Sequence, residues 1–376
     1  MDDYFMQRAL ALALQGWGRT NPNPLVGAVI VREGRIIAEG WHARLGGDHA
    51  EREALNLADE AATDVRGATL YVNLEPCSHY GRTPPCTETI IRHGIGEVVA
   101  AMADPNPKVA GSGFRQLEAA GIRVRTGVLA SEARCLNEIF IKYVTTRTPF
   151  VILKSAMTLD GKIATASGDS RWVSGEVSRG QVHRLRQRVA AIMAGSGTIL
   201  ADDPALTARV ASEDSLDPIR VVVDSQGRIP LASRVVRSES KARLILASTS
   251  RIDPEKERQL LDLGHWVWKL DGPDGHVDLN RLMARLGEQQ IDSVLLEGGG
   301  GLNAAALRAG IVDKVQFFVA PKIIGGAQAV SPVEGSGIER MQDAIRLENM
   351  VASQSGEDWL IEGYPAKTDT RGRAGG

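Results

Sequence analysis

The segment His49-Ala50-Glu51, followed by Pro76-Cys77 and then by Cys86, decides the interpretation of the N-terminal half of the chain. An imidazole and two thiolates are typical zinc ligands, and three protein ligands leave the fourth position open, as in catalytic sites. Zinc lowers the pKa of a bound water to about 7, and a nearby carboxylate can then shuttle protons. The pattern predicts a hydrolytic zinc site with ligands His49, Cys77 and Cys86 and with Glu51 as the catalytic carboxylate.

The positions of these residues suit that chemistry. His49 and Glu51 stand at a predicted helix start, and Cys86 immediately precedes another predicted helix. Helix N-termini favour anions and so help to keep thiolates and carboxylates ionised. A zinc that only stabilises the fold is the alternative, but it would not need Glu51. Cys135 lies in an amphipathic segment and is expected to be a packed or half-exposed thiol.

Length and composition indicate two globular domains. The chain has 376 residues, of which 43% are hydrophobic and 24% charged, and its net charge is −2. Near-neutral charge and an aromatic content of 5% give no support for a nucleic-acid partner. No segment approaches the ~18 unbroken apolar residues of a membrane span, and no secretory signal is visible. Three cysteines argue against a disulfide framework, so a cytoplasmic protein without membrane partners is expected.

Hydrophobic periodicity predicts an α/β fold in both halves. In the first half, helices are expected over 2–15, 49–58, 87–93, 113–120 and from 131, and strands over 26–31, 35–38, 68–73, 98–101 and 122–126. In the second half, strands are expected over 150–154, 190–193, 219–223, 244–247, 266–270, 293–296 and 315–320, with helices such as 179–189 and 280–288 between them. Strands alternating with helices imply a largely parallel sheet. The expected domains are 1–147 and 148–364, followed by a disordered tail over 365–376.

Longer motifs resemble one known family in both halves. The run from Glu75 to Cys86, Glu-Pro-Cys-Ser-His-Tyr-Gly-Arg-Thr-Pro-Pro-Cys, resembles the deaminase domain of the bifunctional riboflavin biosynthesis family RibD, as do 21–27 and 104–107. Residues 159–162, 170–172, 201–204 and 295–299 resemble the reductase domain of that family. The resemblance covers roughly residues 1–364 in the same order. It implies a cytidine-deaminase-like α/β/α domain followed by a dihydrofolate-reductase-like α/β domain.

The resemblance also implies two consecutive reactions. Zn²⁺-dependent deamination of 2,5-diamino-6-ribosylamino-4(3H)-pyrimidinone 5′-phosphate would precede NADPH-dependent reduction of the ribosyl group of the product to ribityl. The partner would be this small phosphorylated pyrimidine, in a protein expected to be a homo-oligomer. By matched position, the deaminase substrate would be bound by Asn23, His42, His79, Arg82, Asp104 and Asn106. His79 and Arg82 would reach the 5′-phosphate through charge-assisted hydrogen bonds.

In the second half, matched positions imply a reductase site. Substrate would be bound by Ser170, Arg186, Leu206, Arg209 and Glu297. Cofactor would be bound by Ala156, Trp172, Thr198, Asp202, Ser225, Gly299, Gly300, Gly301, Leu302, Asn303, Ala304 and Ala305. Independently of the family, the glycine run between a predicted strand and a predicted helix lets backbone N–H groups approach a pyrophosphate. Lys154 is expected to end its strand and is the second catalytic candidate, stabilising the ring-opened sugar during reduction.

Three alternatives remain open from the sequence. A zinc deaminase could act on another nucleoside or on a base in RNA. A zinc-stabilised binding module could keep the fold without the chemistry. One half could be active while the other, above all the reductase half, is degenerate.

Overall fold

The computed structural model describes residues 1–80, 84–107, 109–208, 217–238 and 240–366. The chain divides between Thr148 and Pro149 into two compact units. Each unit contains its own hydrophobic core around a sheet. The fold is α/β in both, as the periodicity of the sequence predicts.

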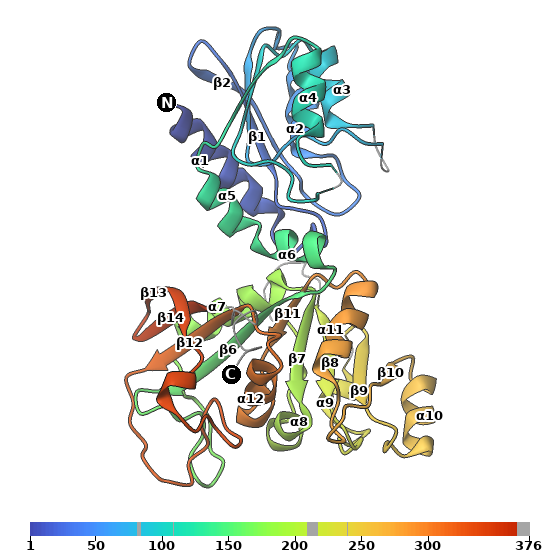
Figure 1. The fold of residues 1–376 in the computed structure, drawn as a ribbon, viewed down its shortest axis with the longest axis vertical. Coiled ribbons are helices and arrows are strands. Elements are labelled where there is room, and N and C mark those ends of the chain that lie inside the picture. Colours follow the sequence, from blue (N-terminus) through green and yellow to red (C-terminus); the bar gives the residue numbers. More distant parts are fainter. Residues whose placement is uncertain (81–83, 108, 209–216, 239, 367–376) are drawn as a thin grey trace, which may run out of the picture. The chain divides into compact units, whose positions relative to one another are not determined.

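Within its described residues, unit 1 is built on a five-stranded sheet in the order β2-β1-β3-β4-β5 (Figure 1). The first two strands form the predicted hairpin, β3 pairs antiparallel with β1, and β4 and β5 continue the sheet parallel to β3. The hairpin turns at Glu33 and Gly34, which both have positive φ, as tight hairpin turns require. The strands are β1 (Gly27–Arg32), β2 (Arg35–Trp41), β3 (Thr69–Val72), β4 (Glu97–Ala100) and β5 (Arg123–Thr126).

Helices cover both faces of this sheet, which makes the α/β/α arrangement. One face carries α1 and α5, and the other carries α2, α3 and α4 (Figure 1). The helices are α1 (Asp2–Ala13), α2 (Ala50–Glu60), α3 (Cys86–Arg92), α4 (Ser112–Ala119), α5 (Ala130–Leu136) and α6 (Glu138–Thr146). Gly40 of β2 lets α2 approach closely, because a Cβ there would lie 2.4 Å from the backbone nitrogen of Ala54. The helix that begins beside His49 is thereby held directly on the sheet.

The described part of unit 2 contains a nine-stranded sheet in the order β10-β9-β8-β7-β11-β6-β12-β14-β13. The strands from β10 to β12 are parallel, and β14 and β13 add an antiparallel end. The strands are β6 (Phe150–Thr158), β7 (Ala191–Gly195), β8 (Ile219–Val223), β9 (Leu244–Ser248), β10 (Trp266–Lys269), β11 (Ser293–Leu296), β12 (Lys314–Ala320), β13 (Leu347–Ser355) and β14 (Asp358–Pro365). The helices are α7 (Glu176–Arg188), α8 (Ser196–Asp202), α9 (Arg234–Arg237), α10 (Pro254–Asp262), α11 (Leu279–Glu288) and α12 (Gly300–Arg308).

The antiparallel end of this sheet is absent from the sequence-based expectation. All residues of β13 except Ser355 are exposed, so that the strand lacks the alternation of buried and exposed side chains that predicts a strand. The expected disorder of the tail is also wrong at its first residue, because Pro365 pairs with Leu347. The rest of that tail, from 367 onward, lies outside the described residues.

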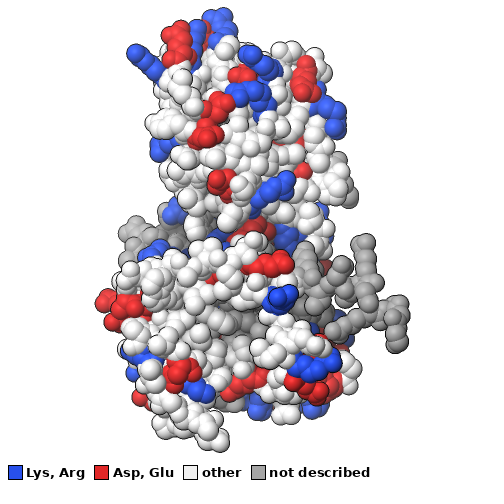
Figure 2. Space-filling view, turned by 60° about the vertical axis from the view of Figure 1, so that its left-hand side comes forward, with Lys and Arg blue, Asp and Glu red and all other residues white. Residues whose placement is uncertain are grey.

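The charged side chains are mixed over the surface. Figure 2 shows lysine and arginine side chains interspersed with aspartate and glutamate, and uncharged side chains between them. The described residues of this face therefore carry no continuous basic track of the kind that binds a nucleic-acid backbone. Across the described ranges, no helix is both long enough and apolar enough to cross a bilayer.

Candidate functional sites

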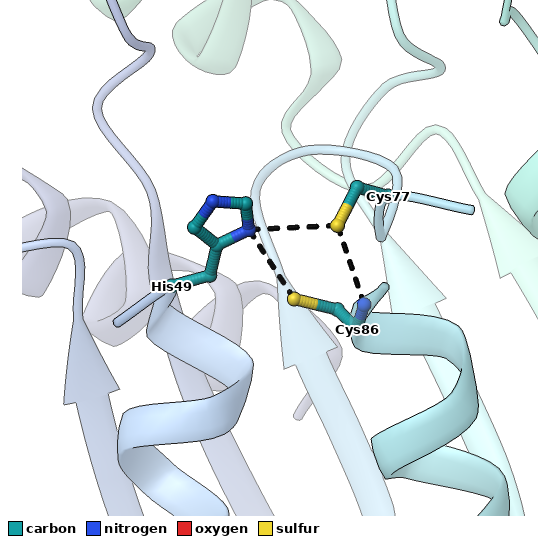
Figure 3. Close-up of side chains that lie close together, drawn as sticks. All are labelled: His49, Cys77 and Cys86. Carbon is teal, nitrogen blue, oxygen red and sulfur yellow. Dashed lines mark hydrogen bonds between the residues drawn. The ribbon is translucent and has the colours of Figure 1, made fainter. Parts of the chain in front are cut away.

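The three metal-ligand candidates converge on one side of the first sheet. His49 is the N-cap of α2, Cys86 is the first residue of α3, and Cys77 lies in the loop that follows β3 (Figure 3). The Nδ1 atom of His49 lies 3.5 Å from Sγ of Cys77 and 3.4 Å from Sγ of Cys86. Segments far apart in the sequence are thus brought together with their ligand atoms facing one another.

The spacing of these atoms fits a tetrahedral zinc. With Zn–N and Zn–S bonds of about 2.0 and 2.3 Å, nitrogen and sulfur ligands of one tetrahedral ion lie about 3.5 Å apart. The two measured nitrogen–sulfur distances match this value, and all three ligand atoms lie within 4.8 Å of one another. Three protein ligands leave the fourth position for water or substrate.

Local hydrogen bonds favour a thiolate at this place. The backbone N–H of Cys86, in the first turn of α3, donates to Sγ of Cys77 over 3.2 Å. Hydrogen bonding by Cys86 and by His49 lowers the pKa of Cys77 to about 4, although burial opposes the change. A thiolate is the form of cysteine that binds zinc.

Glu51 lies beside this cluster in the first turn of α2. Its side chain is buried, with 3% of the residue exposed. Burial, reinforced by the charge of Cys77, raises the pKa of Glu51 to about 7. A carboxyl group with such a pKa can both accept and donate a proton near neutrality, as a proton shuttle must.

Asn23 and His42 are linked on the N-terminal side of the cluster. Nδ1 of His42 donates to the carbonyl oxygen of Asp48 over 2.8 Å, and Nδ2 of Asn23 lies 3.1 Å from Nε2 of His42. Burial lowers the pKa of His42, which favours the neutral ring. The neutral tautomer with hydrogen on Nδ1 accepts from the Asn23 amide and fixes its orientation. The rings of His42 and His49 meet edge to face, 5.5 Å apart.

The remaining candidates in unit 1 lie on two loops. Asp104 and Asn106 follow β4, and the backbone N–H of Asn106 donates to Oδ1 of Asp104 over 2.8 Å. Burial raises the pKa of Asp104, and the hydrogen bond from the N–H of Asn106 counteracts this rise. His79 is exposed. Arg82 lies outside the described residues.

Two buried asparagines support the segment that follows Asn23, and the sequence motifs did not single them out. Asn73 accepts a hydrogen bond from the backbone of Gly27 over 2.8 Å and donates to the carbonyl of Leu25 over 2.9 Å. Asn137 likewise binds both backbone groups of Leu25. The only sequence signal was that Asn73 ends an apolar strand, which does not reveal its partners.

In unit 2, Lys154, Arg186 and Glu297 form one cluster of charges. Arg186 donates to both carboxylate oxygens of Glu297, over 2.9 and 2.6 Å, and to the carbonyl of Thr207. Burial alone would raise the pKa of Glu297, but the charges of Arg186 and Lys154 lower it to about 2. Burial lowers the pKa of Lys154. The two cations therefore share one carboxylate.

The expectation that a strand ends at Lys154 is wrong. The strand β6 continues to Thr158, because Phe317 and Phe318 of β12 still pair with residues beyond Lys154. Lys154 nevertheless follows Leu153, which pairs with Leu296 at the end of β11. The lysine thus lies at the carboxyl end of the shorter neighbouring strand β11, where the sites of α/β sheets form.

The glycine run forms the junction between β11 and α12. Gly299 is the N-cap of α12, and Gly301 is exposed with open space at its missing Cβ. A Cβ on Gly299 would lie 3.6 Å from Oγ1 of Thr198, so that the starts of α8 and α12 are neighbours. Among the described residues, the buried Oδ1 of Asn303 accepts no hydrogen bond. The side chain of Glu334 lies against Gly300, where a Cβ would be 2.4 Å from its Cγ, so the open approach to the start of α12 is at Gly301. Backbone N–H groups at a helix start fit the phosphates of a dinucleotide.

The other reductase candidates occupy varied environments. Trp172 is exposed, with the guanidinium of Arg179 4.8 Å from its ring, and its carbonyl accepts from Nζ of Lys322. Leu206 is buried. Ala156, Ser170 and Ser225 are half-buried, Asp202 is exposed, and Leu302, Ala304 and Ala305 lie on α12 with Gly300. Arg209 lies outside the described residues.

The fold and these sites define a class of protein, a zinc-dependent deaminase domain followed by a reductase domain. Residues 1–102 match the cytidine and deoxycytidylate deaminase zinc-binding region, and residues 149–361 match the RibD C-terminal domain. The chain belongs to the RibD family of riboflavin biosynthesis proteins.

Relatives of known name are similar over nearly the whole chain. The riboflavin biosynthesis protein RibD of Actinobacillus pleuropneumoniae is 47% identical over 95% of this chain and 94% of its own length. That of Escherichia coli is 44% identical, over 92% and 95%. Among solved structures, RibD of Acinetobacter baumannii has a TM-score of 0.86 at 36% identity, covering 97% of this chain and 99% of that one. The diaminohydroxyphosphoribosylaminopyrimidine deaminase/5-amino-6-(5-phosphoribosylamino)uracil reductase of Thermotoga maritima has a TM-score of 0.84 at 40% identity, with the same coverage.

Proposed function

We propose that residues 1–147 deaminate 2,5-diamino-6-ribosylamino-4(3H)-pyrimidinone 5′-phosphate and that residues 148–364 reduce the ribosyl group of the product with NADPH. The observation that carries the deaminase assignment is the buried Glu51 carboxylate beside three convergent zinc-ligand atoms. Zinc held there would supply the hydrolytic nucleophile by acidifying water. This arrangement is the one that hydrolytic removal of an amino group requires.

In deamination, Glu51 would pass one proton of the attacking water to the ring nitrogen and the second proton of that water to the leaving amine, which departs as ammonia while the carbonyl forms. Its raised pKa suits both directions of transfer. Asn23, whose amide is oriented by His42, would bind the base or ribose, together with Asp104 and Asn106. His79 and Arg82 would hold the 5′-phosphate with charge-assisted hydrogen bonds.

In reduction, NADPH would supply the hydride, and its phosphates fit the start of α12. The cofactor would be held by Ala156, Trp172, Thr198, Asp202, Ser225 and residues 299–305. Lys154 would stabilise the oxygen of the ring-opened sugar as negative charge develops on it. Glu297 would orient Lys154 and the substrate. Arg186, with Ser170, Leu206 and Arg209, would line the substrate side, although its guanidinium is bound to Glu297.

We also propose that the protein forms a homo-oligomer. The outermost strand of the second sheet, β13, is nine residues long and exposed along 347–354. Exposed edges invite strand pairing, and an antiparallel pair of identical strands satisfies two-fold symmetry between two copies. Light scattering coupled to size exclusion would show a dimer, and Val351→Lys would convert it to a monomer. A monomeric wild-type protein would refute the oligomer.

The test of the two activities follows ammonia release and NADPH oxidation separately on purified, zinc-loaded protein. Wild-type protein given the diaminopyrimidinone phosphate should show both signals. Glu51→Gln should lose ammonia release by at least about 100-fold, because general acid–base catalysis contributes about that much, yet still oxidise NADPH with the deaminated intermediate. Zinc-loaded protein that turns over neither substrate would refute the proposed function.

A further inference from the structure

We propose that Glu75 is a positioning residue for deamination, which holds the loop carrying Asp104 and Asn106 against the loop carrying the zinc ligand Cys77. The role rests on the proposed deaminase function. Glu75 directly precedes Pro76 and Cys77, and 6% of it is exposed. None of the roles assigned above uses its carboxylate.

The carboxyl group of Glu75 accepts hydrogen bonds from three backbone N–H groups between Asp104 and Gly113. Oε2 accepts from the N–H of Asp104 over 3.0 Å and from the N–H of Gly111 over 2.9 Å. Oε1 accepts from the N–H of Gly113 over 2.8 Å. Three backbone N–H groups that converge on one buried carboxyl group define the position of the loop relative to Glu75.

The same region has little space for an alternative arrangement. A Cβ on Gly113 would lie 2.1 Å from the carbonyl oxygen of Pro76, so the start of α4 is in direct contact with the backbone beside Cys77. Oγ of Ser78 lies 2.6 Å from Oγ of Ser112, which adds a fourth hydrogen bond to the three that Glu75 accepts. A shift of either loop would therefore move the other.

The effect of Glu75 reaches the proposed substrate contacts through a short chain of bonds. Glu75 fixes the backbone of Asp104, and Oδ1 of Asp104 accepts from the N–H of Asn106. Both side chains are proposed to touch the base or ribose in the ground state and in the transition state alike. Loss of such uniform binding raises KM and leaves kcat nearly unchanged.

A carboxylate is needed here because only an acceptor can face three N–H groups. In Glu75→Gln an amide nitrogen takes the place of one carboxyl oxygen. This nitrogen is a donor and cannot accept the hydrogen bond of the backbone N–H that faces it. The matched control is Glu97→Gln in β4 of the same unit. Glu97 is also largely buried, and its carboxylate binds Nε of Arg125 over 2.9 Å and the hydroxyl of Thr69, both on other strands of the sheet and not on the loop of Asp104.

The experiment measures deamination kinetics, bound zinc and amide hydrogen exchange in wild type, Glu75→Gln and Glu97→Gln. Glu75→Gln should raise KM for the diaminopyrimidinone phosphate about tenfold or more, with kcat changed less than about threefold and with zinc content unchanged. The amides of Asp104, Gly111 and Gly113 should exchange faster than in either comparison protein. If Glu75→Gln does not fold, Glu75→Asp replaces it, because it keeps the acceptors at shorter reach, and an intermediate rise in KM is expected.

Four results would contradict the proposed role of Glu75 or the proposed deaminase function. Unchanged KM in Glu75→Gln, or equal effects in Glu97→Gln, would overturn the positioning role. Loss of zinc from Glu75→Gln would overturn it as well, since Glu75 would then support the metal site instead. Wild-type protein that releases no ammonia would overturn the deaminase function and the role of Glu75 together.

Discussion

Arg186 and Glu297 form a two-pronged ion pair, in which Nε and one terminal nitrogen of the guanidinium bind separate carboxylate oxygens over 2.9 and 2.6 Å. Their side chains are 16% and 10% exposed, so water screens the pair weakly. Lys154 lies close enough to lower the pKa of the same carboxylate. Glu297 therefore balances two cations at the carboxyl ends of β7 and β11.

Removing that balance should destabilise unit 2. Glu297→Gln leaves Arg186 and Lys154 without their shared anion, and a buried charge that loses its partner costs about 3–5 kcal/mol. Urea denaturation of the wild-type protein and of Glu297→Gln would measure the loss of unfolding free energy. The control is Glu255→Gln, which breaks an exposed pair with Arg258 and should cost less than about 1 kcal/mol. Equal costs for both variants would contradict the buried-cluster interpretation.

The stabilisation by Glu297 should depend on pH. Its pKa in the folded protein, about 2, lies below the ordinary value of 4.5. A lowered folded pKa gives stability that is complete above pH 4.5 and is lost as the pH falls toward 2. By linkage, roughly 1 kcal/mol of the advantage of wild type over Glu297→Gln should disappear by about pH 3.5. Denaturation curves of both proteins from pH 6 to 3.5 would check this, and a constant difference would refute it.

Lys154→Met should abolish reduction selectively. Removing a preorganised charge from the site of developing negative charge costs about 100-fold or more in rate, while ammonia release should stay at the wild-type level. Lys314→Met is the matched control, because Lys314 is also a largely buried lysine of the same sheet but pairs with Glu362. Full NADPH oxidation by Lys154→Met would remove its catalytic role.

Replacing each of the three cysteines should affect zinc binding differently. Cys77→Ser and Cys86→Ser each lose a thiolate ligand and should weaken zinc binding by at least about 100-fold. Cys135 is exposed and is not part of the ligand cluster, so Cys135→Ser should retain the metal. Elemental analysis after dialysis against a weak chelator would separate the variants. Zinc loss from Cys135→Ser as well would show that the metal is held elsewhere.

Local chemistry made much of the fold predictable. The hairpin at Glu33-Gly34 needs a residue pair that tolerates positive φ, and the strands and helices of both cores keep regular apolar spacing. The strand β13 was not predicted, because all its residues except Ser355 are exposed, and β14 was not predicted either, because most of its residues are only half-buried and do not alternate between buried and exposed. The extension of β6 beyond Lys154 was not predicted, because pairing with β12 maintains it and apolar character does not.

The sequence by itself determined the order of the two domains and predicted the cluster of His49, Cys77 and Cys86 with Glu51 beside it, because each depends on residue types at short spacings. Only the tertiary structure decided that Glu75 binds the loop of Asp104 and that Arg186 binds Glu297. These contacts join residues on separate elements, and a buried polar group can be satisfied by many donors or acceptors. Which partner it meets depends on how the strands and helices pack, and no local pattern in the chain encodes that choice.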